Sequence, residues 1–420
     1  MTPDRRTSPV PWLALQSAAI LAMAWIPGAD ATPWPLLALW ALAFAAYALA
    51  ARSAEQLSER ALWTGAIGLR LGLLGAAPSL SEDVYRYVWD GLVTRSGINP
   101  FAYPPAAPEL AAIRPEWFEL INHPTVPTIY PAGAQIVFVA LAAILPGWLL
   151  FKLAWVCADL LAAWLLSRLA REGAGRRLAT FLYLWSPLLL VEVAWSGHFE
   201  TVGIAAMLGA ILVVRSNAWA GGALLGLGAA LKFAPLAAVP ALFRRYGFVP
   251  ALLAVAVPVV LYVPYAAVGP RLFEGLRTYA DIWEFNAGVY GVLRLLPGPA
   301  DLGRWIGAVV VVSIALFAAY RRWGVGRTLY WTIGAGLLLS PTIHPWYVLW
   351  VLPLACLYRG TGWIVFTGTV FLAYAGRDAY LSSGAWPEPL WLRLLIHVPL
   401  LWLLARDGLG LAKARSERLG

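Results

Sequence analysis

The sequence predicts an all-α polytopic membrane protein, and two properties of the chain carry that prediction. Of the 420 residues, 61% are hydrophobic and only 13% are charged, with a mean hydropathy of +0.70. A soluble domain is about a quarter charged. Apolar runs of about 17 to 22 residues recur along the chain, which is the length that crosses a bilayer as a helix. Helices satisfy their own backbone hydrogen bonds in lipid, whereas open sheets do not.

We expect about 13 or 14 transmembrane helices in a single integral membrane domain that covers residues 1–420. A lysine, Lys232, interrupts the apolar run at residues 219–243, and two short helices are expected to meet there. The other predicted spans lie near residues 10–27, 33–51, 61–77, 148–168, 177–194, 198–214, 247–267, 302–320, 327–341, 345–358, 361–376 and 389–405.

A long hydrophilic segment, residues 78–129, follows the third predicted span and is expected to form a large outer loop that contains interfacial helices. The apolar segment after it, residues 131–145, is bounded by Pro131 and Pro146 and is short for a crossing. We expect a re-entrant or outer-surface helix there. The alternative is a full crossing, with residues 219–243 merged into one span.

Arginine clusters set the expected orientation, because cytoplasmic loops are enriched in Lys and Arg. The net charge of +9 lies largely in these short clusters, which is unlike a nucleic-acid-binding stripe. If residues 131–145 do not cross, both termini and the tail at 406–420 are cytoplasmic. The segments that then share the outer side are residues 78–129, 195–200, 268–301 and 342–346, together with the tip at Lys232.

The run SEDVYRYVWDG at residues 81–91 contains the strongest candidates for a reaction centre. Charged groups that persist near a bilayer usually mark a pathway or a reacting site. A solvated interfacial helix with an ordinary salt bridge, such as Glu82 with Arg86, is the alternative. Four polar side chains recur at i, i+3, i+4 and i+7, so that a helix presents them on one face: Asp83, Arg86, Tyr87 and Asp90.

Two later motifs combine a basic or polar residue with prolines. Lys232 precedes a helix-breaking proline at a hairpin apex, which suits an anionic headgroup, and snorkelling at a helix end is the alternative. His344 is flanked by prolines that fix its backbone, and we expect it to donate a hydrogen bond to phosphate. Trp346, two residues on, is a further candidate for substrate contact.

Two other blocks supply weaker candidates. His198 and Glu200 open the span at 198–214, where helix capping explains the acid as well as substrate binding does. Tyr130 and Gln135, at the end of a proline-rich stretch, are candidates for contact with a sugar. Four charged residues fall inside predicted spans, and we expect internal ion pairing to account for them: Arg70, Lys152, Asp159 and Glu192.

The order of these blocks is similar to that of a known enzyme family. DVYRYVWDG, GINPFAYPP, NHPTVPTIYPAGAQ, WSGHFE, GLGAALKFAP and SPTIHPWY follow one another between about residues 81 and 347. This order resembles bacterial polyprenyl-phosphate-dependent mannosyltransferases, which have the C-type glycosyltransferase membrane fold. In that family the fourth block often reads GHN followed by an acid, so the GHFE of this chain weakens the match at Glu200.

The resemblance implies an inverting glycosyltransferase at the outer face of the cytoplasmic membrane. It would move a sugar, expected to be mannose, from a polyprenyl-phosphate donor to a hydroxyl of a lipid-linked or surface-glycan acceptor. The family's catalytic acid matches Asp83, and its lysine-proline and histidine-proline positions match Lys232 and His344.

The chemistry agrees with these residues. A departing polyprenyl phosphate needs cations that hold its charge, which Arg86, Lys232 and His344 would supply. The acceptor hydroxyl needs one base, for which Asp83 is the first candidate and Glu82 the second. No nucleotide fingerprint is present, so we expect no cofactor. A divalent metal is the alternative, although no HxxxH or Cys/His spacing supports one. The expected partners are the lipid-linked donor, the glycan acceptor and membrane lipid, with no nucleic acid.

A transporter or a lipid or glycolipid flippase is the main rival function. Such a protein would also be helical, with broken helices and charges near the midplane. It predicts inverted repeats and polar residues spread through the membrane depth. The gathering of polar residues on one side favours an enzyme instead, and a non-catalytic scaffold gives no reason for Asp83, Lys232 and His344 to converge.

Overall fold

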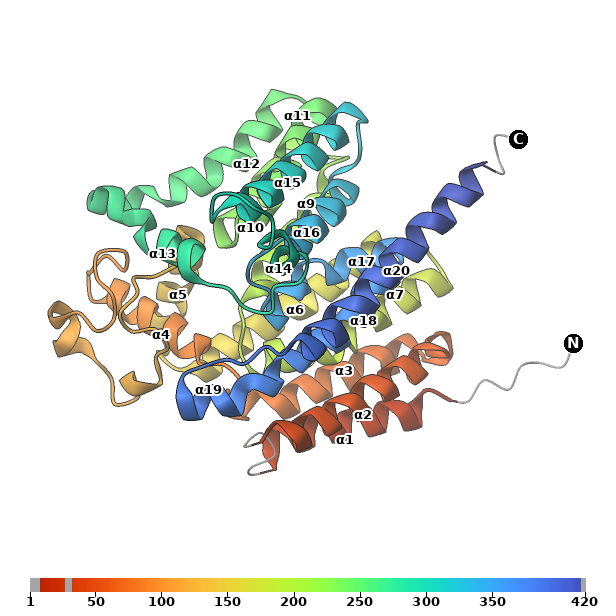
Figure 1. The fold of residues 1–420 in the computed structure, drawn as a ribbon, viewed down its shortest axis with the longest axis horizontal. Coiled ribbons are helices and arrows are strands. Elements are labelled where there is room, and N and C mark those ends of the chain that lie inside the picture. Colours follow the sequence, from red (N-terminus) through yellow and green to blue (C-terminus); the bar gives the residue numbers. More distant parts are fainter. Residues whose placement is uncertain (1–7, 27–31, 417–420) are drawn as a thin grey trace, which may run out of the picture.

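A computed structural model describes residues 8–26 and 32–416 and confirms the all-α fold class. Within those residues the chain forms helices and one isolated bridge between Phe285 and Thr342, and no extended strand. The first three long helices pack side by side at one edge of the bundle, as Figure 1 shows. They are α1 (Val10–Trp25), α2 (Pro33–Ala51) and α3 (Glu59–Leu74).

Four helical stretches within the described residues are long and apolar enough to cross a membrane. They are Pro33–Ala51, Trp148–Leu169 (α6), Gly175–Trp195 and Leu302–Tyr320 (α15), and each coincides with a predicted span. A fifth candidate is bent by 85°, between α12 (Phe248–Leu261) and the segment Val263–Ile282. Most of the other predicted spans are shorter or broken helices, whereas the one near residues 389–405 lies in a helix of 27 residues, Leu390–Ser416, so the count of 13 or 14 stays a prediction.

The predicted break at Lys232 is confirmed. Helix α10 (Ala218–Leu231) ends there, a 3₁₀ turn follows at Ala234–Ala238 (η5), and α11 (Val239–Tyr246) returns. The segment at 131–145 forms α5 (Ala132–Ile144), which is 13 residues long and therefore about 20 Å. That length is short of the ~30 Å hydrocarbon core. Whether α5 is re-entrant or lies on the outer surface stays a prediction.

The long hydrophilic segment at residues 78–129 contains the helix that the polar spacing predicts. Helix α4 (Asp83–Arg95) begins at Asp83, and two short 3₁₀ turns follow, at Pro108–Ile113 and Phe118–Leu120. Gly91 of α4 lies so close to α5 that an added Cβ would come within 2.6 Å of the Phe138 carbonyl oxygen. The two helices therefore pack backbone to backbone.

The C-terminal third is more broken than the apolar pattern predicts. The spans at 345–358 and 361–376 each combine a 3₁₀ turn with a short helix, whereas α20 (Leu390–Ser416) continues through most of the predicted tail, whose last four residues lie outside the described part. The remaining elements are α7 (Ala174–Leu184), α8 (Pro187–Leu189), η4 (Leu190–Trp195), α9 (Glu200–Val213), η6 (Val263–Phe273), α13 (Glu274–Ile282), α14 (Val289–Leu293), α16 (Val325–Leu338), η7 (Pro345–Trp350), α17 (Leu352–Tyr358), α18 (Thr361–Thr369), η8 (Val370–Gly376) and α19 (Arg377–Ser383).

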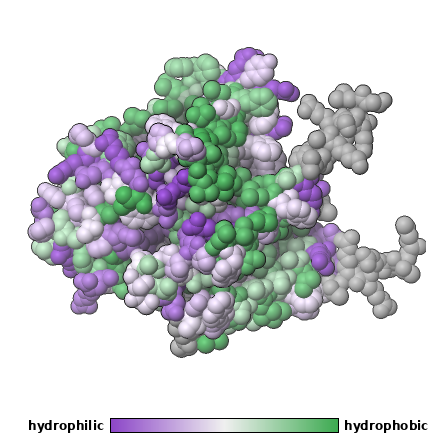
Figure 2. All heavy atoms as spheres, viewed as in Figure 1, coloured by the Kyte–Doolittle hydropathy of each residue, from purple (hydrophilic) through white to green (hydrophobic). Residues whose placement is uncertain are grey.

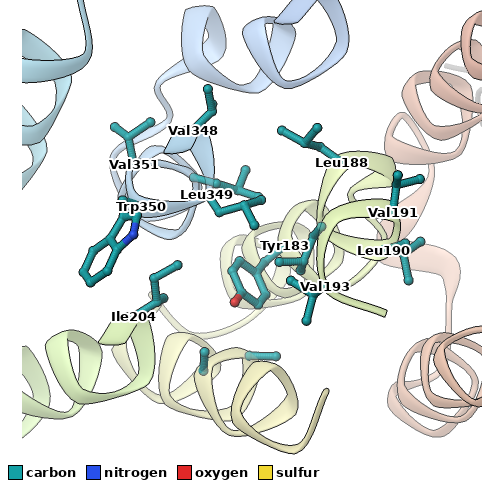
Figure 3. Packing of buried hydrophobic residues seen from close by; sticks show 14 of the residues in the cluster. Tyr183, Leu188, Leu190, Val191, Val193, Ile204, Val348, Leu349, Trp350 and Val351 are labelled. Atoms are coloured by element: carbon teal, nitrogen blue, oxygen red, sulfur yellow. The ribbon is translucent and has the colours of Figure 1, made fainter. Parts of the chain in front are cut away.

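The main hydrophobic core runs through the bundle from α1 to α20, and the part around α8, η4, α9 and η7 lies next to the segments that carry the polar residues. Figure 3 shows Val348, Leu349 and Trp350 of η7 facing side chains from α8, η4 and α9. Segment η4 is a π-helix, a form that often occurs at functional sites. Trp350 fits because Gly203 has no side chain: an added Cβ would lie 2.5 Å from the indole ring.

Charged side chains inside the bundle contact protein partners, but only some of them form the expected ion pairs. Arg70 and Asp159 form a buried ion pair at 2.5 Å. Lys152 does not reach an acid: it donates to the backbone carbonyls of Leu73 and Ala76, at the end of α3.

Figure 2 shows hydrophilic side chains gathered at the end of the molecule where α4 and its loop lie, with a largely hydrophobic surface over the helices in the middle of the view.

Candidate active site

A cavity of about 270 Å³ opens where five separate parts of the chain meet. Its lining comes from residues 80–86, 122–130, 279–285, 344–347 and 374–386. Three of the regions that the sequence places together contribute to it, whereas residues 195–200 and Lys232 do not line it. The lining is rich in aromatic rings, with few charged side chains: Glu82, Asp83, Arg86 and Glu284.

Asp83 stands at the first turn of α4, with its carboxylate at the cavity wall and its side chain 17% exposed. Asn122 donates a hydrogen bond of 2.7 Å to Oδ1. On the other oxygen, the Tyr87 hydroxyl donates to Oδ2 at 3.4 Å, and Nδ1 of His198 lies 3.7 Å away. Two of these three contacts come from residues far along the chain, so the carboxylate is fixed by the tertiary fold.

The environment of Asp83 suits a base. The pKa of its carboxyl is raised to about 6 in total, and burial is the largest cause. The hydrogen bond from Asn122 lowers this pKa, and the nearby carboxylates of Glu200 and Glu82 raise it. A general base works best when its pKa lies near the operating pH. Asp83 is therefore ionised at neutral pH and still basic enough to accept a proton.

His198 is placed by an unusual turn. After η4, Gly197 adopts a φ of +83°, which favours glycine, and the His198 backbone N–H donates to the Glu192 carbonyl at 2.9 Å. An added Cβ at Gly197 would lie 3.0 Å from Lys152 and 3.2 Å from Val84. Burial lowers the pKa of His198 well below its usual range, so the ring is neutral.

Four rings stack in a column beside the cavity: His198, Trp346, His344 and Phe285. The ring centres are 3.9 Å apart from His198 to Trp346, 4.4 Å from Trp346 to His344 and 4.7 Å from His344 to Phe285. Both faces of Trp346 are thus covered, and only its edge reaches the cavity. Burial and the charge of Lys232 lower the pKa of His344 to about 3, so that ring offers an N–H donor without a positive charge.

Lys232 is next to the cavity but not on its wall. Its ammonium lies 2.6 Å from Glu200 Oε1 and 3.9 Å from the ring centre of Tyr347, and its side chain is 30% exposed. Tyr347 does line the cavity, and its hydroxyl is 2.6 Å from that of Tyr279. The acid of the WSGHFE block therefore neutralises Lys232, and the second oxygen of Glu200 is buried without a hydrogen-bond partner.

A buried polar network fixes α4 against the loop that carries Asn122. Asp90 pairs with Arg86 at 3.1 Å and accepts hydrogen bonds from Thr128 and Gln135. Arg86 also donates to the Val126 carbonyl at 2.9 Å. Arg86 lines the cavity whereas Asp90, Thr128 and Gln135 do not, so Asp90 and Gln135 are placed to position Arg86.

The other predicted site residues fall into two groups. Glu82 and Tyr130 line the cavity. Tyr87 and His198 touch Asp83 from behind the wall. The substrate roles of all these residues remain predictions.

Comparison with known proteins then identifies the family. A family model described as alpha-(1->6)-mannopyranosyltransferase, N-terminal domain, matches residues 8–245, which is more than half of the chain. The chain belongs to this family. The predicted membership in a mannosyltransferase family is thus confirmed, and the matched region includes Asp83, Asn122 and Lys232.

One curated relative carries the same description. The alpha-(1->6)-mannopyranosyltransferase A of Corynebacterium glutamicum is 25% identical over 173 residues, which are 40% of this chain and 35% of the relative. The match therefore spans about a third of the relative's length. No solved structure matches the chain.

The sequence did not predict several of the residues that line the cavity of this mannopyranosyltransferase-family protein. Asn122 sits in the NHP run, where its neighbouring prolines indicate only a shaped loop. Aromatic residues are common at membrane edges, so their presence alone signals nothing. The structure adds these to the wall: Tyr279, Trp283, Phe285, Tyr347, Tyr374 and Trp386.

Among the described residues, no three His, Cys, Asp or Glu side chains gather in a way that could hold a metal ion. Two acids near Asp83 are engaged with protein partners. Glu200 pairs with Lys232, and Glu192 accepts from the Tyr374 hydroxyl at 3.1 Å. The expectation that the reaction needs no metal remains a prediction.

Proposed function

We propose that this protein transfers mannose from a polyprenyl-phosphate donor to a glycan hydroxyl, with Asp83 as the general base. The observation that carries the proposal is Asp83 itself, a cavity-lining carboxylate with a pKa of about 6, held by Asn122 and Tyr87 in a chain of the alpha-(1->6)-mannopyranosyltransferase family. The family indicates that the transferred sugar is mannose, and the carboxylate indicates base-assisted transfer to a hydroxyl.

The reaction is a single displacement. The acceptor oxygen attacks the anomeric carbon, the bond from that carbon to the phosphate oxygen breaks, and polyprenyl phosphate leaves with the electron pair. Asp83 takes the proton of the acceptor hydroxyl. The phosphate leaves as a weak base and needs no proton. One displacement inverts the anomeric carbon, so an α-linked product requires a β-linked donor.

The leaving phosphate gains stabilisation from fixed donors. Arg86 lines the cavity, and its guanidinium carries a permanent charge. His344, also in the lining, offers a neutral N–H. Both cations share their charge with an acid, Arg86 with Asp90 at 3.1 Å and Lys232 with Glu200 at 2.6 Å. Arg86 lines the cavity whereas Lys232 lies beyond Tyr347, so we assign the main electrostatic role to Arg86.

The surroundings of the cavity support the proposed lipid-linked donor and the proposed outer orientation. Four helical stretches can cross a membrane, and the cavity lies among the loops at the hydrophilic end shown in Figure 2. Nucleotide sugars are made and used in the cytoplasm, whereas a lipid-linked sugar can reach an outer site within the bilayer. We accordingly place the protein in the cytoplasmic membrane, with Asp83 facing outward.

The experiment compares three donors with the purified protein in lipid nanodiscs and an α-mannoside acceptor. They are β-linked polyprenyl-phosphate mannose, its α-linked epimer and GDP-mannose, each with labelled mannose. We expect an α-linked product from the β-linked lipid donor only. Transfer from GDP-mannose, or from the α-linked donor with the same product, would overturn the proposed donor and the inverting course.

A further inference from the structure

A second cavity, of about 480 Å³, adjoins the reaction cavity. Three residues line both: Glu284, Phe285 and Trp386. The rings of Phe285 and Trp386 meet edge to face with their centres 5.2 Å apart, and together with Glu284 they contribute to the lining of both cavities. Helix α14 and the start of α20 form the far side of the second cavity.

The two cavities differ in chemistry. The first is mainly aromatic around a single base. The second is lined by two carboxylate–guanidinium pairs, Glu284 with Arg294 and Glu388 with Arg393. The Glu388–Arg393 distance is 2.9 Å, and Glu388 also accepts the backbone N–H of Asn286. These contacts hold both acids in place in the lining of the second cavity.

The charge balance of the second cavity indicates the kind of ligand that it fits. Its lining contains two acids and two arginines, which sum to zero net charge. A site for a phosphate or another anion would carry excess positive charge. Paired carboxylates and guanidinium groups instead offer fixed acceptors and donors side by side, which match the neighbouring hydroxyls of a neutral sugar. Trp386 adds an aromatic surface of the kind that packs on sugar rings.

The hydrogen-bonding groups here are not fully used. The Nε atom of Arg393 is buried and has no hydrogen-bond partner, and the side chain of Arg294 is 57% exposed. Exposed ion pairs contribute only about 0–1 kcal/mol to stability, so folding gives little reason for two of them on one wall. A ligand would meet the exposed parts of these two guanidinium side chains, since Arg294 is 57% and Arg393 41% exposed.

We propose that the second cavity binds the non-reacting sugar residues of the acceptor glycan, with Arg294, Arg393 and Glu388 as its hydrogen-bonding groups. This inference rests on the proposed function, since it places the acceptor's terminal hydroxyl near Asp83. The glycan chain then passes Glu284 and the edges of Phe285 and Trp386 into the second cavity. The site makes the protein selective for acceptors longer than one sugar.

The test compares two acceptors of different length, octyl α-mannoside and an octyl α-(1→6)-linked tetramannoside, with β-linked polyprenyl-phosphate mannose as the donor. Arg294→Gln and Arg393→Gln remove one guanidinium each. Arg277→Gln is the matched control, because Arg277 is an exposed arginine of α13 that lines neither cavity.

Wild type is expected to have a lower KM for the tetramannoside than for the monomannoside. Each cavity variant should raise the tetramannoside KM by about tenfold, the loss of roughly one hydrogen bond to a charged group. The kcat of both acceptors and the monomannoside KM should stay unchanged, which also shows that the variants fold. Arg277→Gln should behave as wild type.

Three results would overturn the inference: an unchanged tetramannoside KM in both variants, an equal loss with both acceptors, or no preference for length in wild type. A wild-type protein that transfers no mannose from this donor would instead contradict the proposed function. The two failures are thus distinguishable.

Discussion

At the scale of single residues, the pKa of Asp83 is set by contacts that have opposite effects on it. Burial disfavours its charged form and Asn122 favours it, which leaves the pKa at about 6. The sequence predicts the carboxylate, because its spacing with Arg86 and Tyr87 is helical. It does not predict Asn122, since nothing in a proline-rich loop tells which side chain turns back toward the helix 39 residues earlier.

The pH dependence of transfer follows from that pKa. A base must be unprotonated, so activity should be full above pH 7 and fall tenfold per pH unit below about 6, as Asp83 takes up a proton. Initial rates between pH 4.5 and 8.5, at subsaturating acceptor, measure the midpoint. A rate that stays flat down to pH 4.5 would show that no group with this pKa acts as the base.

Replacement of Asn122 tests the same contact from the other side. Asn122→Ala removes a hydrogen bond that lowers the pKa of Asp83, so the acid limb of the pH profile should move to higher pH. The rate at pH 8 should change less than the rate at pH 6. An unmoved midpoint, with the rate reduced equally at every pH, would mean that Asn122 only supports the fold.

At the scale of elements, breaks in helices position the site more than the helices do. The turn at Gly197 places His198 beside Asp83, and the break after α10 places Lys232 beside Tyr347. The sequence reveals the second break through Lys232 and a proline. The sequence does not predict the π-helix at η4, because an i→i+5 turn within an apolar run has no residue pattern of its own.

Gly197→Ala should destabilise the protein and reduce its activity. The left-handed backbone costs an alanine about 1–2 kcal/mol, and its Cβ meets Lys152 at 3.0 Å. Gly147→Ala is the control, since that glycine has an ordinary φ and open space around it. Thermal melts in detergent should show a lower Tm for Gly197→Ala alone. Equal melting temperatures would contradict the strain assigned to this turn.

Buried charges show why pairing is hard to predict. Lys152 and Asp159 share a face of α6 at a spacing of seven, yet the acid pairs with Arg70 of α3 and the lysine caps α3 instead. Spacing within one helix gives the face and leaves the neighbour across it unknown. The apolar runs likewise predict the four longest spans and fail where prolines turn a span into 3₁₀ segments, as in η7.

At the scale of the whole molecule, segments that are far apart in the sequence meet because the loops between the helices lie at one end of the bundle. The arginine clusters predict which end is cytoplasmic, and that orientation depends on α5 not crossing the bilayer. The structure supports the convergence through the cavity, which draws on residues from 80 to 386. The membrane face is a property that only labelling can decide.

A cysteine pair reports the orientation. In a background with Cys157 and Cys356 replaced, Arg171→Cys should react with a membrane-impermeant maleimide only in inverted vesicles. Glu109→Cys, on the exposed surface of the outer loop, should react only in intact cells. Reaction of position 171 from outside would show that α5 or another segment makes an additional crossing.

The central claim is that Asp83 accepts the proton of the acceptor. The most direct measurement is the rate of labelled mannose transfer by Asp83→Asn from β-linked polyprenyl-phosphate mannose, compared with wild type and with Glu109→Gln, an exposed acid outside the cavity. We expect a loss of about 100-fold or more at pH 7.5 for Asp83→Asn, with an unchanged Tm, and full activity for Glu109→Gln. Wild-type transfer by a folded Asp83→Asn protein would contradict the account.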